Sequence, residues 1–295
     1  MLLRERGLPK DLKGKRIVVT GAASGIGRAI AESAAGRGAR VLLADIDALK
    51  LESAARAAGP SAKTCLCDVS DHKSVKALAL QAQTLMGGCD MVFVNAGIIS
   101  SSRFVQFSPE TVDKILGVNV RGAWSTAAIF ARQMMDAGLG GHICFTGSEH
   151  SLGLQHAGAA IYTASKHAVL GLAEVLRAEM PEEIKVSILC PGLTATALGS
   201  LPEAASSDAA ARAARRHAKV QARGMPAREV AQAAIDGALK GDFYIMTHAH
   251  AVRAAEYRYE EIRTAFEQQS PPERNGDQYE VNRVLAEVLA EEGKK

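Results

Sequence analysis

Tyr162 and Lys166 are the two side chains of this sequence best suited to acid–base chemistry. Four residues apart, they lie on one face of any helix that contains them. An ammonium group beside a phenol favours the phenolate and lowers the tyrosine pKa from its ordinary value of about 10. A phenol tuned in this way can act as a general acid and base nearer neutral pH. The alternative is a surface contact between cation and phenol, since helices carry such pairs by chance.

Two polar residues upstream can complete such a site. Ser148 follows the apolar run 142–146 and lies fourteen residues before Tyr162. Its hydroxyl can hold a substrate oxygen or, in the plainer interpretation, cap the end of a strand. Asn119 falls within a predicted helix over 112–132, where asparagine is a poor helix former and needs a reason. A tolerated polar residue is the alternative for Asn119.

A glycine-rich segment separates the first apolar run, Arg16–Thr20, from a predicted helix that begins at Arg28. Glycines let the backbone approach a pyrophosphate, and the helix N-terminus offers that anion unpaired N–H groups and partial positive charge. The spacing is G-x-x-x-G-x-G, and its position after a strand and before a helix predicts a dinucleotide site. The expected contacts are Gly21, Ser24, Gly25, Ile26 and Gly27.

The second apolar run, 40–44, ends at Asp45, eighteen residues after Gly27. A carboxylate there can accept hydrogen bonds from the adenosine ribose hydroxyls and repels a 2′-phosphate, which favours NAD over NADP. The glycine loop has Ser24 in place of a lysine or arginine, so it supplies no cation to offset that repulsion. The plainer interpretation makes Asp45 the N-cap of a helix over Ala48–Ala58.

These side chains require a scaffold, and the sequence alternates short apolar runs with alanine-rich helical stretches. Continuous apolar strands separated by helices indicate a parallel sheet buried on both faces, which right-handed crossovers make a doubly wound α/β sheet. The runs predicted as strands are 16–20, 40–44, 64–67, 91–94, 142–146, 185–190 and 243–246. Ligands bind such sheets at the carboxyl ends of strands. The residues expected there are Asp68, Val69, Asn95, Ala96 and Gly97.

One domain covers all 295 residues in this interpretation, with its core over 14–250. Residues 194–226 break the regular alternation with Gly199, Pro202 and an Ala/Arg-rich helix, which predicts an inserted helical flap over the substrate. Residues 251–295 are predicted to form a helical C-terminal tail.

Composition excludes several classes of partner. The net charge of +3 is too small and dispersed to indicate nucleic-acid binding. The five cysteines lie mostly in or beside apolar runs, which is typical of reduced, buried thiols in a cytosolic protein, and Cys65 and Cys67 lack zinc-site spacing. No run reaches the roughly 18 apolar residues of a membrane span, and the N-terminus lacks a signal-peptide core. We expect a cytoplasmic protein with no metal and no membrane contact.

Taken together, the motifs resemble the short-chain dehydrogenase/reductase family, in that family's order, from residue 16 to about 200. The matching segments are TGAASGIG at 20–27, Asp45, Asp68 with Val69, NAG at 95–97, Asn119 with Val120, Ser148, Tyr162 with Lys166, and Pro191 with Gly192 and Thr196. The resemblance implies a Rossmann fold. It also implies a homodimer or homotetramer with the helices around Asn119 and Tyr162 at subunit contacts.

The resemblance further implies a catalytic tetrad of Asn119, Ser148, Tyr162 and Lys166. By that analogy Tyr162 exchanges a proton with the substrate oxygen, which Ser148 stabilises. Lys166 binds the nicotinamide ribose and depresses the tyrosine pKa, and Asn119 holds a water in the proton relay. Tyr162 and Lys166 are therefore cofactor contacts too, and the nicotinamide end would also contact Pro191, Gly192, Thr194 and Thr196.

The expected function is hydride transfer between NAD(H) and a small secondary alcohol or ketone. Two other interpretations stay open, a non-catalytic dinucleotide-binding scaffold and an NADP-dependent carbonyl reductase. Glu149 and His150 depart from the small or apolar residues usual beside the serine, and His150 and His156 either touch substrate or are merely solvated. An apolar pocket wall is predicted from Leu193, Leu198, Leu201 and Met225.

Overall fold

The computed structural model describes residues 12–153, 156–196, 198, 208–270 and 278–292. The chain divides into two compact units, Met1–Ala249 and His250–Lys295. All residues predicted to bind cofactor or to do chemistry belong to the first unit. The expected single domain over the whole chain stays a prediction.

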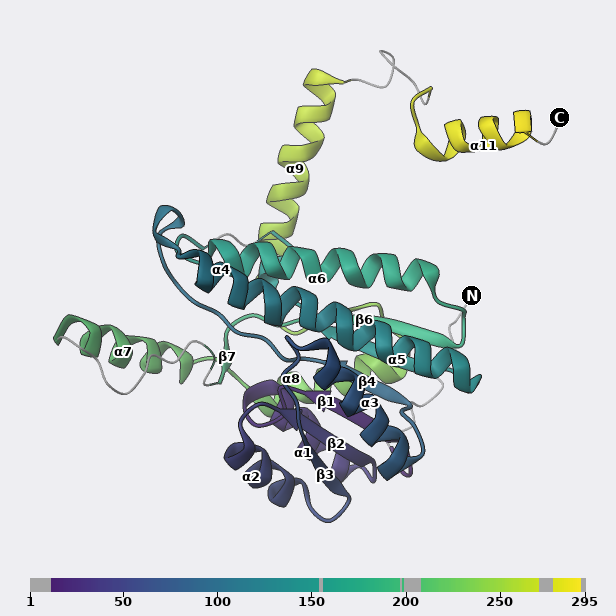
Figure 1. Ribbon diagram of the computed structural model, residues 1–295. Coiled ribbons are helices and arrows are strands. Elements are labelled where there is room, and N and C mark those ends of the chain that lie inside the picture. The colour runs from purple at the N-terminus through teal and green to yellow at the C-terminus, as the bar shows by residue number, and fades with distance from the viewer. Residues whose placement is uncertain (1–11, 154–155, 197, 199–207, 271–277, 293–295) are drawn as a thin grey trace, which may run out of the picture. The chain divides into compact units, whose positions relative to one another are not determined.

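Among the described residues, seven parallel strands form one sheet in the order β3-β2-β1-β4-β5-β6-β9 (Figure 1). The strands are β1 (Arg16–Thr20), β2 (Arg40–Asp45), β3 (Ala62–Leu66), β4 (Met91–Val94), β5 (Gly141–Thr146), β6 (Ile184–Cys190) and β9 (Tyr244–Met246). The direction in which successive strands are added reverses between β1 and β4. The carboxyl ends of these two strands therefore mark the topological switch point, where ligands bind such sheets. The predicted doubly wound parallel sheet is confirmed.

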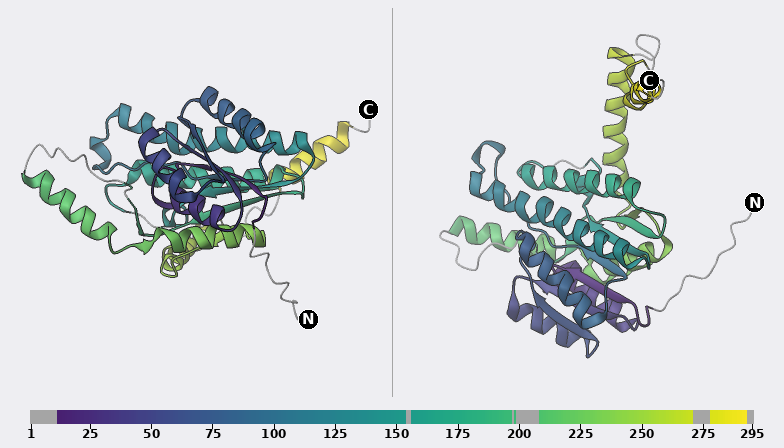
Figure 2. Two further views of the ribbon diagram at one scale, coloured as in Figure 1. Left: turned by 90° about the horizontal axis from the view of Figure 1, so that it is seen from below. Right: turned by 45° about the vertical axis from the view of Figure 1, so that its right-hand side comes forward.

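Helices cover both faces of the sheet (Figure 2). One face carries α1 (Gly25–Gly36), α2 (Ala48–Ala58) and α8 (Ala227–Lys240), and the other carries α3 (His72–Met86), α5 (Ala123–Ala137) and α6 (Ala160–Glu179). Successive strand side chains alternate between the two cores: Val18 packs with α3 and α5, whereas Ile17 and Val19 pack with α1. Burial on both faces explains why the strands read as continuous apolar runs.

The helix predicted over 112–132 is not continuous. The structure has α4 (Pro109–Leu116), a π-helical segment η2 (Gly117–Gly122) and then α5. A side chain at Gly122 would place its Cβ 2.9 Å from Val69 Cγ2 and 3.0 Å from Val69 O, so only glycine allows this approach. Short π-helical turns within α-helices are frequent at functional sites. Asn119 lies inside this one.

The predicted flap, 194–226, is bounded by two short strands that pair with each other, β7 (Thr194–Ala195) and β8 (Met225–Pro226). Between them, α7 (Asp208–Gln221) is the Ala/Arg-rich helix expected from the sequence. Arg212, Arg215, Arg216, Lys219 and Arg223 are all exposed, which agrees with a solvated basic face. Gly199, Leu201 and Pro202 lie outside the described residues.

The second unit contains α9 (Ala251–Gln269) and α11 (Val281–Glu292), as the predicted helical tail requires. No described residue of α11 is buried. Nowhere in the described ranges is a helix both long enough and apolar enough to cross a membrane.

We expect His142 on β5 to make the stability of the fold depend on pH. Its Nε2 lies 2.8 Å from Ser187 Oγ, and burial lowers the imidazole pKa from 6.5 to about 4. Below pH 6.5 the unfolded chain takes up a proton that the folded state refuses, so stability falls toward pH 4 by up to about 1.4 kcal/mol per unit. We expect Tm to drop over this window and to drop less in His142→Gln. Equal pH slopes for the two proteins in thermal unfolding would contradict this assignment.

Candidate active site

The carboxyl end of β5 positions the serine. The chain leaves the strand at Thr146, turns through Gly147 and enters the short 3-10 helix η3 (Glu149–Ser151) with Ser148 as its N-cap. The Ser148 hydroxyl accepts a hydrogen bond from His150 N at 3.2 Å, and Ser148 N donates to Ser151 Oγ at 3.2 Å. Ser148 thus caps this turn and also lines the pocket described below. The cap predicted for Ser148 is therefore present, and it is compatible with a hydroxyl that holds a substrate oxygen.

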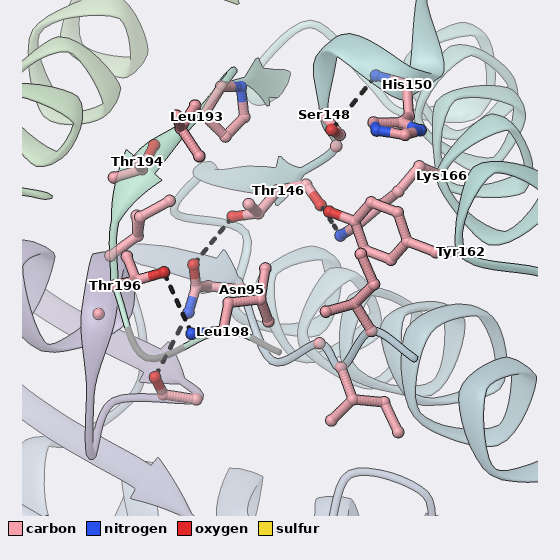
Figure 3. Close-up of a pocket in the computed structure, with 18 of the residues that line it drawn as sticks. Asn95, Thr146, Ser148, His150, Tyr162, Lys166, Leu193, Thr194, Thr196 and Leu198 are labelled. Atoms are coloured by element: carbon pink, nitrogen blue, oxygen red, sulfur yellow. Dashed lines mark hydrogen bonds between the residues drawn. The ribbon is translucent and has the colours of Figure 1, made fainter. Parts of the chain in front are cut away.

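Lys166 lies one helical turn after Tyr162 on α6, as the spacing predicts, and is almost wholly buried. Its ammonium donates to Thr146 O at 2.7 Å, and Nζ lies 5.6 Å from the centre of the Tyr162 ring (Figure 3). Burial lowers the lysine pKa from 10.5 to about 8, because a low-dielectric interior disfavours the charged form.

The expected lowering of the Tyr162 pKa is not what this structure gives. Burial raises it from 10.0 to about 12, the hydrogen bond with Ser148 opposes the rise, and the Glu149 carboxylate adds to it. Desolvation of the phenolate therefore outweighs any help from Lys166, whose Nζ hydrogen-bonds Thr146 O. The sequence predicted the contact correctly and the direction of the pKa shift wrongly.

Asn119 has a reason for its place in the helix. Its Oδ1 accepts from Ile98 N at 2.8 Å, and its Nδ2 donates to Ile98 O at 2.9 Å and to Ser165 Oγ at 2.9 Å. The side chain therefore joins the loop after β4 to α6, next to Lys166. It is buried and does not line the pocket, so it supports the active-site wall.

The glycine loop is held against β4 by Asn95. The Asn95 Nδ2 donates to Thr20 O at 3.0 Å. Its Oδ1 accepts from Thr146 Oγ1 at 3.2 Å (Figure 3), so Asn95 joins the ends of three strands. Gly21 has φ +66°, and a Cβ there would lie 2.8 Å from Ala96 Cα. A Cβ at Gly27 would run into the Gly21 carbonyl. These two glycines are thus required by packing around the loop.

Asp45 is not a helix N-cap. The N-cap of α2 is Asp47, whose side chain accepts from Lys50 N. Asp45 instead ends β2 and accepts from Ala23 N at 3.0 Å and from Asp47 N at 3.0 Å. The carboxylate is held at the edge of the glycine loop, where the cofactor hypothesis requires it.

One pocket of about 910 Å³ gathers most of the predicted residues. The predicted residues that line it are Gly21, Ser24, Gly25, Ile26, Asp45, Asn95, Gly97, Ser148, Tyr162, Lys166, Pro191, Gly192, Thr194 and Thr196. The predicted residues outside its lining are Gly27, Asp68, Val69, Ala96 and Asn119. Asp68 closes its own turn by accepting from Ser70 N and Ser70 Oγ, so its contact with a cofactor stays a prediction.

The apolar wall differs from the predicted one. Leu193 and Leu198 line the pocket, but Met225 packs against the hydrophobic core instead. At the end of α7, Val220 and Gln221 also line the pocket. Neither residue could be predicted from the sequence, because both lie on a helix whose polar composition indicates a solvated face.

His150 is buried rather than solvated. Its Nδ1 lies 2.7 Å from Thr163 Oγ1, and its ring packs edge-on against Tyr162 with centroids 5.3 Å apart (Figure 3). Burial lowers its pKa to about 4, so the imidazole is neutral near pH 7. His156 is exposed, with its ring 5.4 Å from that of His150. Both histidines line the pocket.

Two further residues that support the site were not predicted as site residues. Thr20 Oγ1 accepts from Asn95 N and Ala96 N, and Thr146 O accepts from the Lys166 ammonium. Each residue is the last of a strand and stands beside a predicted motif, and this position is the sequence feature that could have indicated its role. In the part of the chain that the structure describes, no cluster of His, Cys, Asp or Glu could hold a metal ion.

Comparisons with known proteins identify the family of this chain. The short chain dehydrogenase family model matches residues 15–205. The chain is 36% identical over 196 residues to a (+)-cis,trans-nepetalactol synthase of Nepeta racemosa, covering 65% of this chain and 72% of that protein. It is 35% identical over 189 residues to a 2,5-dichloro-2,5-cyclohexadiene-1,4-diol dehydrogenase of Sphingobium indicum, covering 63% and 75%.

A solved structure extends the likeness to three dimensions. The short chain dehydrogenase/reductase of Burkholderia phymatum in complex with NAD matches with a TM-score of 0.79 and 31% identity, covering 86% of this chain and 96% of that one. The family model, the relatives and the solved structure all indicate the same family. This protein is a member of the short-chain dehydrogenase/reductase family of oxidoreductases.

Proposed function

We propose that this protein transfers hydride between NAD(H) and a secondary alcohol or ketone, with Tyr162 as general acid and base. One observation carries the proposal: Ser148, Tyr162 and Lys166 line the same pocket as the glycine loop and Asp45. A dinucleotide on that loop would bring its reactive end to the phenol. Single-domain architecture over residues 1–295, a homodimer or homotetramer and a cytoplasmic location belong to the same proposal.

The residues present fit a dinucleotide. The glycine loop opens α1, whose N-terminus can receive a pyrophosphate, and no acidic residue in the first turn opposes it. Asp45 offers carboxylate oxygens to the adenosine ribose and repels a 2′-phosphate, which supports NAD over NADP. The pocket, about 910 Å³, lies within the range of about 300–1,000 Å³ typical of small-molecule and cofactor sites.

The proton chemistry follows from the pocket's hydroxyls. In ketone reduction the substrate oxygen would lie between the Ser148 and Tyr162 hydroxyls, and Tyr162 would give it the phenolic proton. A pKa near 12 keeps the phenol protonated and ready to donate. In alcohol oxidation the same transfer would run in reverse, from the alcohol to Tyr162 after its phenolic proton has left, and the raised pKa of the phenol opposes that prior loss. The bound cofactor supplies or accepts the hydride.

The relatives narrow the search for a substrate. The Sphingobium indicum protein is named for a cyclic diol and the Nepeta racemosa protein for nepetalactol. A pocket with Leu193, Leu198 and Val220 among its apolar lining residues and His150 among its polar ones suits a small alcohol with both kinds of surface. We propose cyclic secondary alcohols and diols as the first compounds to test.

The deciding experiment is a panel of such alcohols and the matching ketones with each cofactor, followed at the nicotinamide absorbance. We expect turnover with NAD(H). Cofactor binding without turnover of any panel member would favour the scaffold interpretation. A preference for NADP would favour the carbonyl reductase interpretation.

The flap should respond to ligands, since Val220 and Gln221 of α7 line the pocket while the arginines of the same helix are exposed. We propose that cofactor orders α7 and that substrate closes it over the pocket, as a lid that excludes water. Trypsin cleavage over 212–223 should slow when NAD is added and slow further with substrate. Cleavage at Arg283 in the tail is the internal control. Equal rates in all three states would indicate a static helix.

A further inference from the structure

His150 places an imidazole at the reacting end of the pocket, beside the serine and the tyrosine. The side chain lines the pocket, yet only 7% of the residue is exposed. It belongs to the turn that Ser148 caps, because the backbone N of His150 donates to the Ser148 hydroxyl. The ring packs edge-on against Tyr162, and Figure 3 shows imidazole, serine and phenol on the same side of the pocket. The imidazole therefore adjoins the place proposed for the reacting oxygen of the substrate.

One of the two ring nitrogens holds the imidazole in place. Nδ1 of His150 lies 2.7 Å from Oγ1 of Thr163, the residue that follows Tyr162 on α6. This contact joins η3 to α6 through the ring, so the orientation of the imidazole is set before any substrate binds. A side chain oriented in advance loses little conformational entropy when it binds a ligand.

The other ring nitrogen of His150, Nε2, is open to a ligand. Among the described residues it has no hydrogen-bond partner, since the ring is held through Nδ1. Of the buried and half-buried residues in the described ranges, only Gln133 has a fully enclosed side-chain nitrogen or oxygen without a partner. Nε2 is therefore reached from the pocket and is not sealed in the core. A polar atom in a largely desolvated wall favours a ligand that completes its hydrogen bonding.

The chemistry of the imidazole indicates that this ligand group is a hydroxyl. Burial lowers the pKa of His150 to about 4, so the ring is neutral near pH 7, with one nitrogen that donates and one that accepts. The hydroxyl of Thr163 can donate to Nδ1 or accept from it, so Nε2 can take either role. A substrate hydroxyl suits both roles, whereas a carbonyl oxygen only accepts and an ammonium only donates.

We propose that His150 binds a second hydroxyl of the substrate, so that the pocket selects diols and hydroxy ketones over simple alcohols and ketones. The reacting oxygen would lie between the hydroxyls of Ser148 and Tyr162, and the second oxygen would meet Nε2 of His150. A substrate without that hydroxyl would cover Nε2 with carbon and leave it unpaired, which a desolvated site penalises. The inference rests on the proposed hydride transfer and narrows its substrate class. Proton transfer stays with Tyr162.

The test compares cyclohexanol with the cyclohexane-1,2-, 1,3- and 1,4-diols as substrates for NAD reduction, because these compounds share a ring and differ in one hydroxyl. We expect wild type to have a kcat/KM about tenfold higher for the best diol than for cyclohexanol. His150→Asn should remove this preference, since asparagine can keep an amide near Nδ1 but has no atom in the place of Nε2. His150→Gln reaches that place and should restore part of the preference. General damage to the site lowers both rates, so the ratio reports recognition.

Two other histidines sharpen the comparison. His72 is the matched control, since its Nδ1 also lies near a hydroxyl, 2.6 Å from Ser125 Oγ, but it is not among the residues that line the pocket. His72→Asn should keep the wild-type ratio. His156 does line the pocket, with its ring 5.4 Å from that of His150. Loss of the preference in His156→Asn, with His150→Asn unaffected, would overturn the assignment to His150.

A measurement without turnover completes the test. With NADH bound, an alcohol can occupy the pocket but cannot be oxidised, and nitrogen NMR of the imidazoles then reports contacts with the ring. We expect the best diol to shift the Nε2 resonance of His150, assigned by its absence in His150→Gln, and cyclohexanol to shift it much less. Equal shifts, or equal kcat/KM for diols and cyclohexanol in wild type, would refute the inference. Absence of turnover with every alcohol would instead refute the proposed function.

Discussion

Replacing Tyr162 with phenylalanine should lower kcat by about 10² to 10⁴, the usual contribution of a positioned acid or base, and leave Kd for NAD unchanged. The change deletes one hydroxyl and keeps the ring, so the edge-on packing against His150 survives. Removing a buried hydroxyl also relieves its desolvation, and we expect no loss of folding stability. Steady-state rates with the best alcohol of the panel, together with cofactor titration, check both halves of this expectation.

Tyr244→Phe is the matched control for that variant. Tyr244 lies on β9, and its hydroxyl donates to Glu174 Oε1 at 2.9 Å near the surface. Tyr244 is not among the residues that line the pocket. The control should keep the wild-type kcat. Near-normal turnover by Tyr162→Phe would remove Tyr162 from the proposed mechanism, whatever the control does.

Local patterns predicted the parts of this site that depend on local geometry. Tyr162 and Lys166 share a helix face because of their spacing, and Ser148 meets them because β5 ends at the switch edge of the sheet. Strand-to-loop boundaries likewise placed Asp45 and Asn95 at the pocket. Such arrangements follow from periodicity and from the parallel sheet.

The rest depends on contacts between distant segments. The direction of the Tyr162 pKa shift comes from how completely the fold buries the phenol, which spacing along α6 does not report. The π-helical turn at Asn119 ends at Gly122, which packs on Val69, 53 residues earlier in the chain. Glu149 looked anomalous beside the serine, and its contact with the Gly192 turn depends on the pairing of β5 with β6. The Tyr162 pKa shift, the surroundings of the turn at Asn119 and the position of Glu149 all depend on tertiary packing.

The proposed choice of NAD over NADP depends on the carboxylate of Asp45. The cation near Asp45 is the ammonium of Lys50. The hydrogen bond with Asp47 is the main cause of the raised pKa of Lys50, and the charge of Asp45 adds a smaller contribution. Lys50 Nζ forms an ion pair with Asp47 Oδ2 at 2.8 Å. That pairing holds the ammonium on the cap of α2. We therefore expect Lys50 to leave the repulsion between Asp45 and a 2′-phosphate in place.

Asp45→Ala should weaken NAD and relieve the penalty against NADP, moving the ratio of the two kcat/KM values toward NADP by at least about tenfold, or 1.4 kcal/mol. The carboxylate both accepts from the ribose and repels the phosphate, so its loss acts on the two cofactors in opposite directions. Kinetics with each cofactor at a fixed alcohol concentration measure the ratio. Wild type itself should prefer NAD.

A second aspartate separates cofactor selection from damage to the fold. Asp71 is the N-cap of α3, accepts from Lys73 N at 3.0 Å and lies outside the pocket lining. Asp71→Ala removes a cap, which costs about 0.5–2 kcal/mol of stability, and should leave the cofactor ratio unchanged. Asp45→Ala also frees the amides of Ala23 and Asp47, so it shares that structural penalty. A wild-type preference for NADP of tenfold or more, or equal ratios in wild type and Asp45→Ala, would contradict the role given to Asp45.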